Sequence, residues 1–167
     1  MIAVSDTGPL LYLSLIEQIH LLPRMFERIL IPGAVADELS HSSAPHRAFA
    51  MIENRPDWLQ VHAVASMDSA LGGLGTGERE SIALAVSSGA DFLLIDDRAA
   101  RDIATQAMGV VASGTIGILY EAARNDAIPF SAAEFDQSIE RLLATNFYSS
   151  NSLRKAIERL SENLHGR

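Results

Sequence analysis

Short apolar runs alternate with helix-like segments along most of the 167-residue chain, and this alternation constrains the fold more than any other feature. Four of the runs, at 2–5, 28–31, 91–95 and 110–112, each contain at least three successive apolar residues. Strands of this kind are buried on both faces, as in parallel sheets covered by helices. The sequence therefore predicts a single α/β domain with a mostly parallel sheet flanked by helices.

The other predicted elements fill the gaps between these strands. The run at 59–64 alternates apolar and polar residues, which is typical of a half-exposed or edge strand. A glycine-rich loop at 71–77 precedes a buried helix, and Gly89 caps the end of that helix. Helices are expected at 10–15, 34–39, 44–54, 78–88, 98–108 and 115–123.

Two further helices are predicted at the C-terminal end. Ser131 and Glu134 have the spacing of a capping box, which Phe130 and Phe135 flank as a hydrophobic staple. The last helix begins near Ser152, and its apolar face either docks on the core or binds a partner. That face contains Leu153, Ile157, Leu160 and Leu164. We expect a core at 1–126 and a helical extension at 127–167 packed on the same domain.

The composition excludes several kinds of protein. The chain has no cysteine, which rules out disulfides, thiolate metal sites and cysteine nucleophiles. No basic stretch precedes an apolar run at the N-terminus, and no segment has the length and hydrophobicity of a membrane span. We therefore expect a cytoplasmic protein. The formal net charge of −8 disfavours a polyanionic partner, but it falls to −3 if five acidic side chains bind cations.

Acidic side chains follow the strands in four separate segments. Asp6 comes directly after the first strand, and Asp96 and Asp97 come directly after another buried strand. Glu38 lies one to two turns into the helix after the second strand, and Glu78 lies in the first turn after the glycine loop. Ligands of open α/β sheets bind beyond the carboxyl ends of the strands. We therefore expect these acids to meet at one edge of the sheet.

Each acid also has a structural interpretation. Asp6 could cap a helix or form a turn, and Glu38 could be a solvated helix residue. Glu78 could complement the helix dipole. One of Asp96 and Asp97 could cap the next helix, which leaves the other without a structural role. Repeated placement at strand ends favours one shared site over four separate structural roles.

A cluster of carboxylates without histidine or cysteine favours hard divalent cations. Converging carboxylates repel one another unless they are protonated or neutralised. Oxygen ligands suit Mg²⁺ or Mn²⁺ rather than Zn²⁺. These ions lower the pKa of bound water and stabilise charge on a phosphate. The cluster therefore predicts hydrolysis of a phosphodiester.

Four segments, taken in order, resemble those of PIN-domain nucleases. They are VSDTGPL at 4–10, IPGAVADEL at 31–39, GTGERESIALA at 75–85 and LLIDDRAAR at 93–101. Their order and spacing are similar to those of the VapC-like ribonuclease toxins of prokaryotic toxin–antitoxin pairs. The last two segments, together with SGTIGIL at 113–119, look like a PIN-like subgroup of prokaryotic proteins. The resemblance covers residues 1–126.

The resemblance implies a doubly wound sheet, a site for Mg²⁺ or Mn²⁺, cleavage of RNA, a homodimer and a cognate antitoxin protein. Asp6, Glu38 and Glu78 match the first three acids of the family. Typical toxins have Asp at the third position, so the longer Glu78 side chain must reach the metal. Asp96 or Asp97 matches the fourth acid. All five residues are therefore candidate catalytic and metal-binding residues.

Three further residues are candidates for binding RNA beside this site. Arg98 and Arg101 lie three residues apart, near one helix face, and either hold RNA phosphates or pair with Asp97 or Asp102. Thr115 follows a strand. Its hydroxyl either positions water or phosphate or caps the next helix.

The function that these residues favour is a divalent-metal-dependent endoribonuclease, the toxin of a type II toxin–antitoxin pair. The alternative is a catalytically degenerate PIN-like module that binds nucleic acid or protein. Glu78 at the third position and the net acidity favour that alternative. A phosphatase of the haloacid-dehalogenase type also begins with a strand and an Asp. It needs a second Asp two residues later, where this chain has Gly8.

Overall fold

The sheet has five parallel strands, and its strand order reverses at the centre. The computed structural model describes residues 1–41, 44–66, 71–106 and 108–166. Within these residues the strand order is β3-β2-β1-β4-β5, and every adjacent pair is parallel. The predicted α/β class is confirmed, as is the edge position of the strand that begins at residue 59. The strands are β1 (Ile2–Ser5), β2 (Arg28–Pro32), β3 (Leu59–His62), β4 (Phe92–Leu94) and β5 (Ala112–Ser113).

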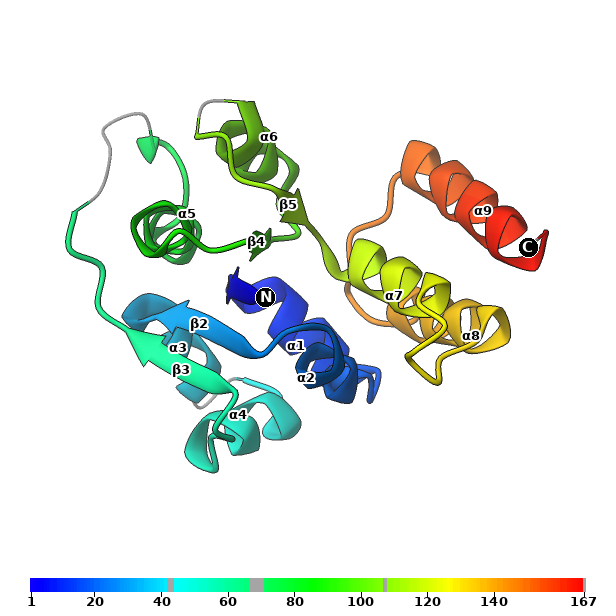
Figure 1. Cartoon of the computed structure of the whole chain (residues 1–167), viewed down its shortest axis with the longest axis horizontal. Helices are drawn as coiled ribbons and strands as arrows, with labels where there is room; N and C mark the ends of the chain where they lie inside the picture. Colours follow the sequence, from blue (N-terminus) through cyan, green and yellow to red (C-terminus); the bar gives the residue numbers. More distant parts are fainter. Residues whose placement is uncertain (42–43, 67–70, 107, 167) are drawn as a thin grey trace.

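Helices cover both faces of this sheet (Figure 1). Helices α5 and α6 lie on one face, and α1, α2 and α4 lie on the other. Helices α7, α8 and α9 continue this second layer beyond β5. None of the described helices has the length and hydrophobicity to span a membrane. The helices are α1 (Thr7–Leu15), a 3-10 helix η1 (Ile19–Leu21), α2 (Leu22–Met25), α3 (Gly33–Ser40), α4 (His46–Glu53), α5 (Thr76–Ser88), α6 (Arg98–Gln106), α7 (Thr115–Arg124), α8 (Ala132–Leu143) and α9 (Asn151–His165).

Alternate residues of the central strands enter two separate apolar cores, which explains why these strands are apolar throughout. In β1, Ala3 belongs to the core that contains α1, and Val4 belongs to the core that contains α5. In β2, Ile29 and Ile31 belong to the first core and Leu30 to the second. Burying one such aliphatic side chain stabilises the fold by about 1.5–3 kcal/mol. The sheet therefore needs both layers of helices.

The reversal of strand order lies between β1 and β4. The chain runs outward from β1 to β3, crosses back through α5, and then continues from β4 to β5. In open α/β sheets this reversal opens a crevice at the carboxyl ends of the two strands. Ser5 pairs with Leu94, and Asp6 N donates a hydrogen bond to Leu94 O at 2.9 Å. The residues that directly follow β1 and β4 are therefore neighbours.

Several elements differ from those expected from the sequence. Strand β5 begins later because Val110 N donates to Ala104 O near the end of α6, so pairing with β4 starts at the Val111 carbonyl. Strand β3 ends at His62 rather than at residue 64. Helices η1 and α2 occupy a stretch for which the sequence pattern predicts no element. Residue 107, inside the predicted helix at 98–108, lies outside the described residues.

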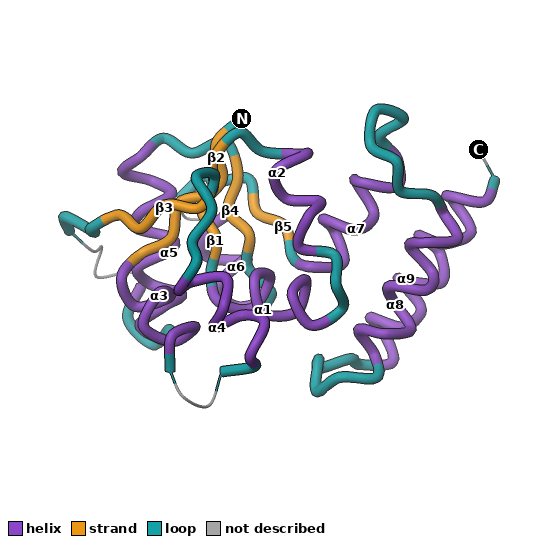
Figure 2. The backbone as a smooth tube through the Cα atoms, turned by 90° about the horizontal axis from the view of Figure 1, so that it is seen from below, coloured by secondary structure: helices purple, strands orange, loops and turns teal. Residues whose placement is uncertain are grey.

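The C-terminal helices pack side by side on α7 (Figure 2). The predicted capping box begins α8, since Ser131 N donates to Glu134 Oε2 at 2.7 Å and Glu134 N donates to Ser131 Oγ at 3.3 Å. Asp136 joins α8 to α9 through the Ser161 hydroxyl at 2.6 Å and His165 Nε2 at 2.7 Å. These contacts join the two helices of the extension to each other.

The apolar face of α9 docks on the core, which is one of the two outcomes expected from its sequence. Ile157 and Leu164 are buried in the same core as α1, and Leu153 and Leu160 pack against it. This arrangement leaves that face unavailable to a partner.

Replacing Phe135 by Ala should lower the free energy of unfolding by about 3–5 kcal/mol, because the fully buried ring leaves a cavity. If the extension and the core form one domain, Trp58 fluorescence and circular dichroism should report one coincident transition in urea. Val61→Ala on the exposed edge strand β3 is the control and should change the free energy by less than about 0.5 kcal/mol. Two separate transitions would contradict the single-domain prediction.

Candidate functional site

Asp6 lies at the centre of the candidate site, directly after β1. It occupies the N-cap position of α1, but within the described residues its side chain makes no capping hydrogen bond. Its exposed fraction is 9 %, and it belongs to none of the ion pairs formed by those residues. An ionised carboxylate held this way is desolvated without a neutralising partner, which is energetically costly.

Glu38 approaches Asp6 from α3, and Gly77 makes room for the approach. A Cβ atom at Gly77 would lie 3.1 Å from Glu38 Oε1 and 3.2 Å from Asp6 Oδ1. The two carboxylates therefore flank one point, and a side chain at position 77 would displace them. The other oxygen of Glu38, Oε2, accepts a hydrogen bond from the Thr7 hydroxyl.

Glu78 comes from the first turn of α5, where its side chain has a structural contact. Its Oε2 accepts a hydrogen bond from Gly75 N at 2.8 Å, which is the backward half of a capping box. Glu78 also lines the same cleft as Asp6, and its charge raises the pKa of Asp6. The residue therefore caps α5 and stands beside the buried acid.

Asp96 follows β4 and is held in place by Thr115. Thr115 N donates to Asp96 Oδ1 and Thr115 Oγ1 donates to Asp96 Oδ2, both at 2.7 Å. Gly8 and Gly114 leave space for this carboxylate, since a Cβ atom at Gly8 would lie 3.0 Å from Oδ2 and one at Gly114 only 2.7 Å from Oδ1. Asp96 thus lies between α1 and α7.

Thr115 has neither of the two roles expected from the sequence, which were contact with water or phosphate and capping of the next helix. Its exposed fraction is 0 %, so it offers no surface to RNA. The N-cap of α7 is Gly114, and Thr115 is the first residue of the helix. Both polar groups of Thr115 donate to Asp96, so this residue orients an acid of the site.

Asp97 differs in role from Asp96, because it caps the following helix. Its Oδ1 accepts a hydrogen bond from Ala100 N at 2.8 Å, the geometry of an N-cap for α6. Asp97 is exposed and lines the mouth of the cleft, whereas the charge of Asp96 acts on Asp6. Of the two adjacent acids, Asp96 is the one that faces Asp6.

The pKa of Asp6 shows how closely the four acids lie. This pKa is raised from 3.8 to about 7, mainly by burial. The charges of Glu78, Glu38 and Asp96 contribute to the increase, whereas a hydrogen bond from the Thr7 backbone opposes it. Burial also raises the pKa of Asp96, although its hydrogen bonds and a nearby guanidinium lower it. Four segments that are distant in the sequence therefore place carboxylates within electrostatic reach of one another.

A cleft of about 930 Å³ is lined by Asp6, Glu78, Asp96 and Asp97. Arg98 and Arg101 of α6 line one side of it. Arg98 makes an exposed ion pair with Asp102 at 3.8 Å, a kind of pair that contributes little to stability. Arg101 donates from Nη1 to Ile95 O at 3.0 Å, and its charge lowers the pKa of Asp96. Arg98 thus makes one of the pairs expected from the sequence, while Arg101 is directed toward the acids.

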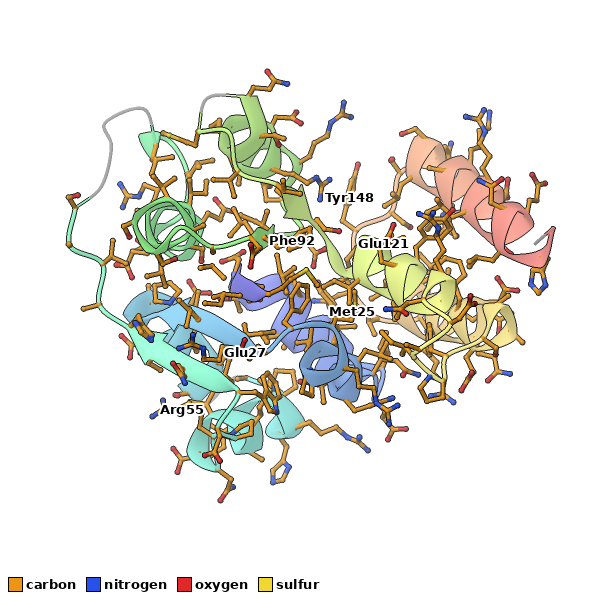
Figure 3. The ribbon with its side chains drawn as sticks, viewed as in Figure 1. Met25, Glu27, Arg55, Phe92, Glu121 and Tyr148 are labelled. Atoms are coloured by element: carbon orange, nitrogen blue, oxygen red, sulfur yellow. The ribbon has the colours of Figure 1, made fainter. Side chains whose placement is uncertain are left out.

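A second cleft, of about 510 Å³, lies between α2 and α7 and includes none of the predicted site residues. Met25, Phe92 and Glu121, labelled in Figure 3, belong to its lining. Phe92 begins β4 and Met1 precedes β1, so this cleft lies toward the amino ends of the strands. The acids instead follow the carboxyl ends, where ligands of open α/β sheets bind.

The donor set fits a hard divalent cation in its chemistry. The candidate ligands are carboxylate oxygens, and Asp6 is buried beside like charges. Within the described residues, no three His, Asp or Glu side chains stand ready around one point to hold an ion. Glu38 is exposed and Glu78 partly exposed, so both have room to turn toward Asp6. Binding an ion therefore requires these two side chains to move.

Sequence reasoning missed two residues that support this site. The Thr7 hydroxyl holds Glu38, and Glu80 Oε2 accepts a hydrogen bond from Ala34 N at 3.2 Å, which ties α5 to the start of α3. It also missed the far wall of the cleft, formed by residues of the connection between α8 and α9. These contacts join segments far apart in the chain, and no local pattern marks them.

Comparison with known proteins identifies the family. A family model described as a PIN domain matches residues 2–163, which includes α8 and most of α9. The chain therefore belongs to the PIN-domain family, and the resemblance seen in its four sequence segments is confirmed. Members of this family are typically nucleases, and they generally use divalent metal ions. The VapC-like subgroup stays a prediction.

A solved structure with the same fold comes from an archaeon. It is a PilT N-terminus domain protein from the hyperthermophile Sulfolobus solfataricus P2, with a TM-score of 0.50 and 16 % sequence identity. The similarity covers 90 % of this chain and 100 % of that chain. At this identity the likeness concerns the fold alone. No curated protein matches the sequence significantly.

The raised pKa of Asp6 predicts that raising the pH destabilises the metal-free protein. Between its unfolded value near 3.8 and its folded value of about 7, the folded chain keeps a proton that the unfolded chain has released. Asp6→Asn removes this penalty. The stability gained from that substitution should be about 3 kcal/mol larger at about pH 8 than at about pH 5. Urea unfolding in EDTA measures it, and an equal gain at both pH values would contradict the raised pKa.

Proposed function

We propose that this protein is a Mg²⁺- or Mn²⁺-dependent endoribonuclease. The observation that carries the proposal is the environment of Asp6, a buried carboxylate with three further acids in reach and no cationic partner in the described part of the chain. Such crowding disfavours the ionised form until a cation neutralises it. Membership of a family of metal-using nucleases supports the same conclusion.

The site residues have separate tasks in this proposal. Asp6 and Asp96 follow two neighbouring strands and supply ligands with fixed positions. Glu38 and Glu78 supply ligands that turn in from α3 and α5. The bound cation would lower the pKa of water and stabilise the negative charge that develops on the scissile phosphate.

Other side chains hold the acids and the substrate. Thr115 orients Asp96, and Thr7 orients Glu38. Arg101 balances part of the charge of Asp96 and remains near the acids. Arg98 is exposed at the mouth of the cleft, where its guanidinium would contact an RNA phosphate in exchange for its weak pair with Asp102.

The contact between Thr115 and Asp96 predicts a measurable effect on metal affinity. Thr115→Val removes the hydroxyl while keeping the shape of the side chain. It should weaken Mn²⁺ binding about tenfold to a hundredfold, because groups behind a metal ligand fix its orientation. Isothermal titration calorimetry measures the affinity, and Thr115→Ser should keep most of it. Unchanged affinity in the valine variant would show that Asp96 does not depend on this hydroxyl.

A second candidate function is a degenerate PIN-like module that binds nucleic acid or protein without turnover. The contact between Glu78 and Gly75 favours it, since the third acid is engaged in capping α5. A degenerate site would bind Mn²⁺ weakly or not at all, which the same calorimetry would reveal. The buried Asp6 favours the enzyme, because a module without turnover has no need of a buried charge.

We further propose that the chain is the toxin of a toxin–antitoxin pair and forms a homodimer. The four family segments at VapC-like spacing support this assignment. Its test is the neighbouring reading frame, which should encode a small DNA-binding antitoxin that relieves growth arrest by this chain. Sedimentation velocity tests the dimer. A monomer in solution, or no effect on growth, would contradict these finer assignments and leave the nuclease proposal standing.

Matched substitutions of the adjacent acids test the nuclease directly. Asp6→Asn and Asp96→Asn should each abolish cleavage of a labelled single-stranded RNA in Mn²⁺ while leaving the circular dichroism spectrum intact. Asp97→Asn is the control and should keep most of the activity, because Asn caps helices about as well as Asp. Cleavage by clean Asp6→Asn protein would contradict the proposed site. Equal losses at Asp96 and Asp97 would contradict the division between a site acid and a helix cap.

A further inference from the structure

The far wall of the acidic cleft comes from the C-terminal extension. Residues Phe147, Tyr148 and Ser150 of the α8–α9 connection line it, followed by Ser152 and Leu153 at the start of α9. The chemistry assigned to the carboxylates uses none of these residues. The wall therefore faces the acids and α6 across the cleft without a role in the proposed reaction.

Tyr148 is the most prominent side chain of this wall. Its exposed fraction is 83 %, the highest among the exposed large hydrophobic side chains of the described residues. Figure 3 shows it in the gap between α6 and the N-terminal end of α9. An aromatic ring that is largely exposed, yet lines a cleft, is available for contact with a molecule that enters that cleft.

The backbone that carries Tyr148 is anchored on both sides. Thr145 Oγ1 donates to Leu142 O at 2.6 Å and accepts from Phe147 N at 3.1 Å. The Phe147 ring packs edge-on against Tyr12 of α1, with 4.9 Å between ring centroids. Ser150 then accepts a hydrogen bond from Leu153 N at 3.2 Å and begins α9. The exposure of Tyr148 is therefore built into an ordered connection.

A short chain of contacts connects this wall to the acids. Tyr12 lines the same cleft, and burial together with the charge of Asp96 raises the pKa of its phenol. Tyr12 also packs on Phe147, which directly precedes Tyr148. Tyr12 therefore lies within electrostatic reach of Asp96 and also contacts the residue that precedes Tyr148.

The charges around this wall suit a polyanion despite the net acidity of the chain. The first turn of α9 contains no acidic residue, and Arg154 and Lys155 follow as exposed cations. Cations at a helix N-terminus oppose the helix dipole, so their position there does not stabilise α9. Across the cleft, α6 presents Arg98. An RNA strand in the cleft would therefore meet positive charge on the α6 side, and the two α9 cations directly follow Leu153, the last residue of the wall.

We propose that Tyr148 is a stacking platform for an unpaired nucleobase, and that the α8–α9 connection is the substrate-binding wall of this nuclease. The inference rests on the proposed function, which supplies the phosphodiester at the acids. Every nucleobase has an aromatic face that stacks on a tyrosine ring with little sequence preference. Bases in a duplex are already stacked and paired, so the wall selects single-stranded RNA.

The affinity of Tyr148 variants for a base-containing and a base-free strand tests this proposal. The full chain carries Asp6→Asn to prevent cleavage, and fluorescence anisotropy in Mg²⁺ follows a labelled short oligoadenylate or an abasic strand of equal length. Tyr148→Ala should weaken oligoadenylate binding about tenfold to a hundredfold and leave abasic binding unchanged. Tyr148→Phe should retain the affinity, because it keeps the ring. Val61→Ala, on the opposite sheet edge, is the matched control.

The outcomes separate this proposal from the proposed function. Suppose that the protein with Asp6 intact cleaves RNA, while Tyr148→Ala in the Asp6→Asn background binds oligoadenylate as tightly as that background. The stacking platform is then wrong and the nuclease proposal stands. If oligoadenylate binding depends on Tyr148 but the protein with Asp6 intact cleaves no RNA, the stacking platform stands and the nuclease proposal is wrong. An equal loss on the abasic strand, or tighter binding of duplex, overturns the platform. The platform is also overturned if Tyr148→Ala dissociates a dimer and leaves the affinity for RNA unchanged. That result would place the Tyr148 ring between two copies of the chain.

Discussion

Crowding of carboxylates at the point where the strand order reverses is the constraint on which the rest of this structure depends. Strand β1 pairs with β2 on one side and with β4 on the other, so Asp6 and Asp96 leave the sheet as neighbours. Burial and the other acids then raise the pKa of Asp6 to about 7. This arrangement costs stability, and such local conflicts are expected where function requires them. Gly77 and Gly8 are part of the same arrangement, because a side chain at either position would collide with the carboxylates.

Hydrogen-bond donors hold three of the four acids in position. Thr115 holds both oxygens of Asp96, the Thr7 hydroxyl holds one oxygen of Glu38, and a backbone amide holds one oxygen of Glu78. A carboxylate has more acceptor sites than these donors occupy, so each retains capacity for a cation. Preorganisation by hydrogen bonds is therefore strongest for Asp96 and weaker for Glu38 and Glu78, whose side chains are longer and more exposed.

The C-terminal extension changes an open sheet edge into a cleft with two walls. Helices α8 and α9 pack on α7 through an apolar face, and their connection contacts α1 where Phe147 meets Tyr12. This packing places an exposed aromatic residue opposite the acids. The family match likewise continues through most of α9. In the proposed function, the same segment would therefore supply both packing against α7 and contact with the substrate, because its buried side orders the backbone that its exposed side presents.

The sequence by itself determined the parallel α/β sheet, the edge strand and the succession of acids after strands, because these signals lie within a few neighbouring residues. Which of Asp96 and Asp97 faces the site stayed open at the level of the sequence, although Asp97 directly precedes a predicted helix and Asp favours that position. Only the tertiary structure decided that Thr115 serves Asp96, that Arg101 turns toward the acids while Arg98 remains at the surface, and that Tyr148 faces them. Those facts depend on contacts between distant segments, which form only when both helical layers have packed on the sheet.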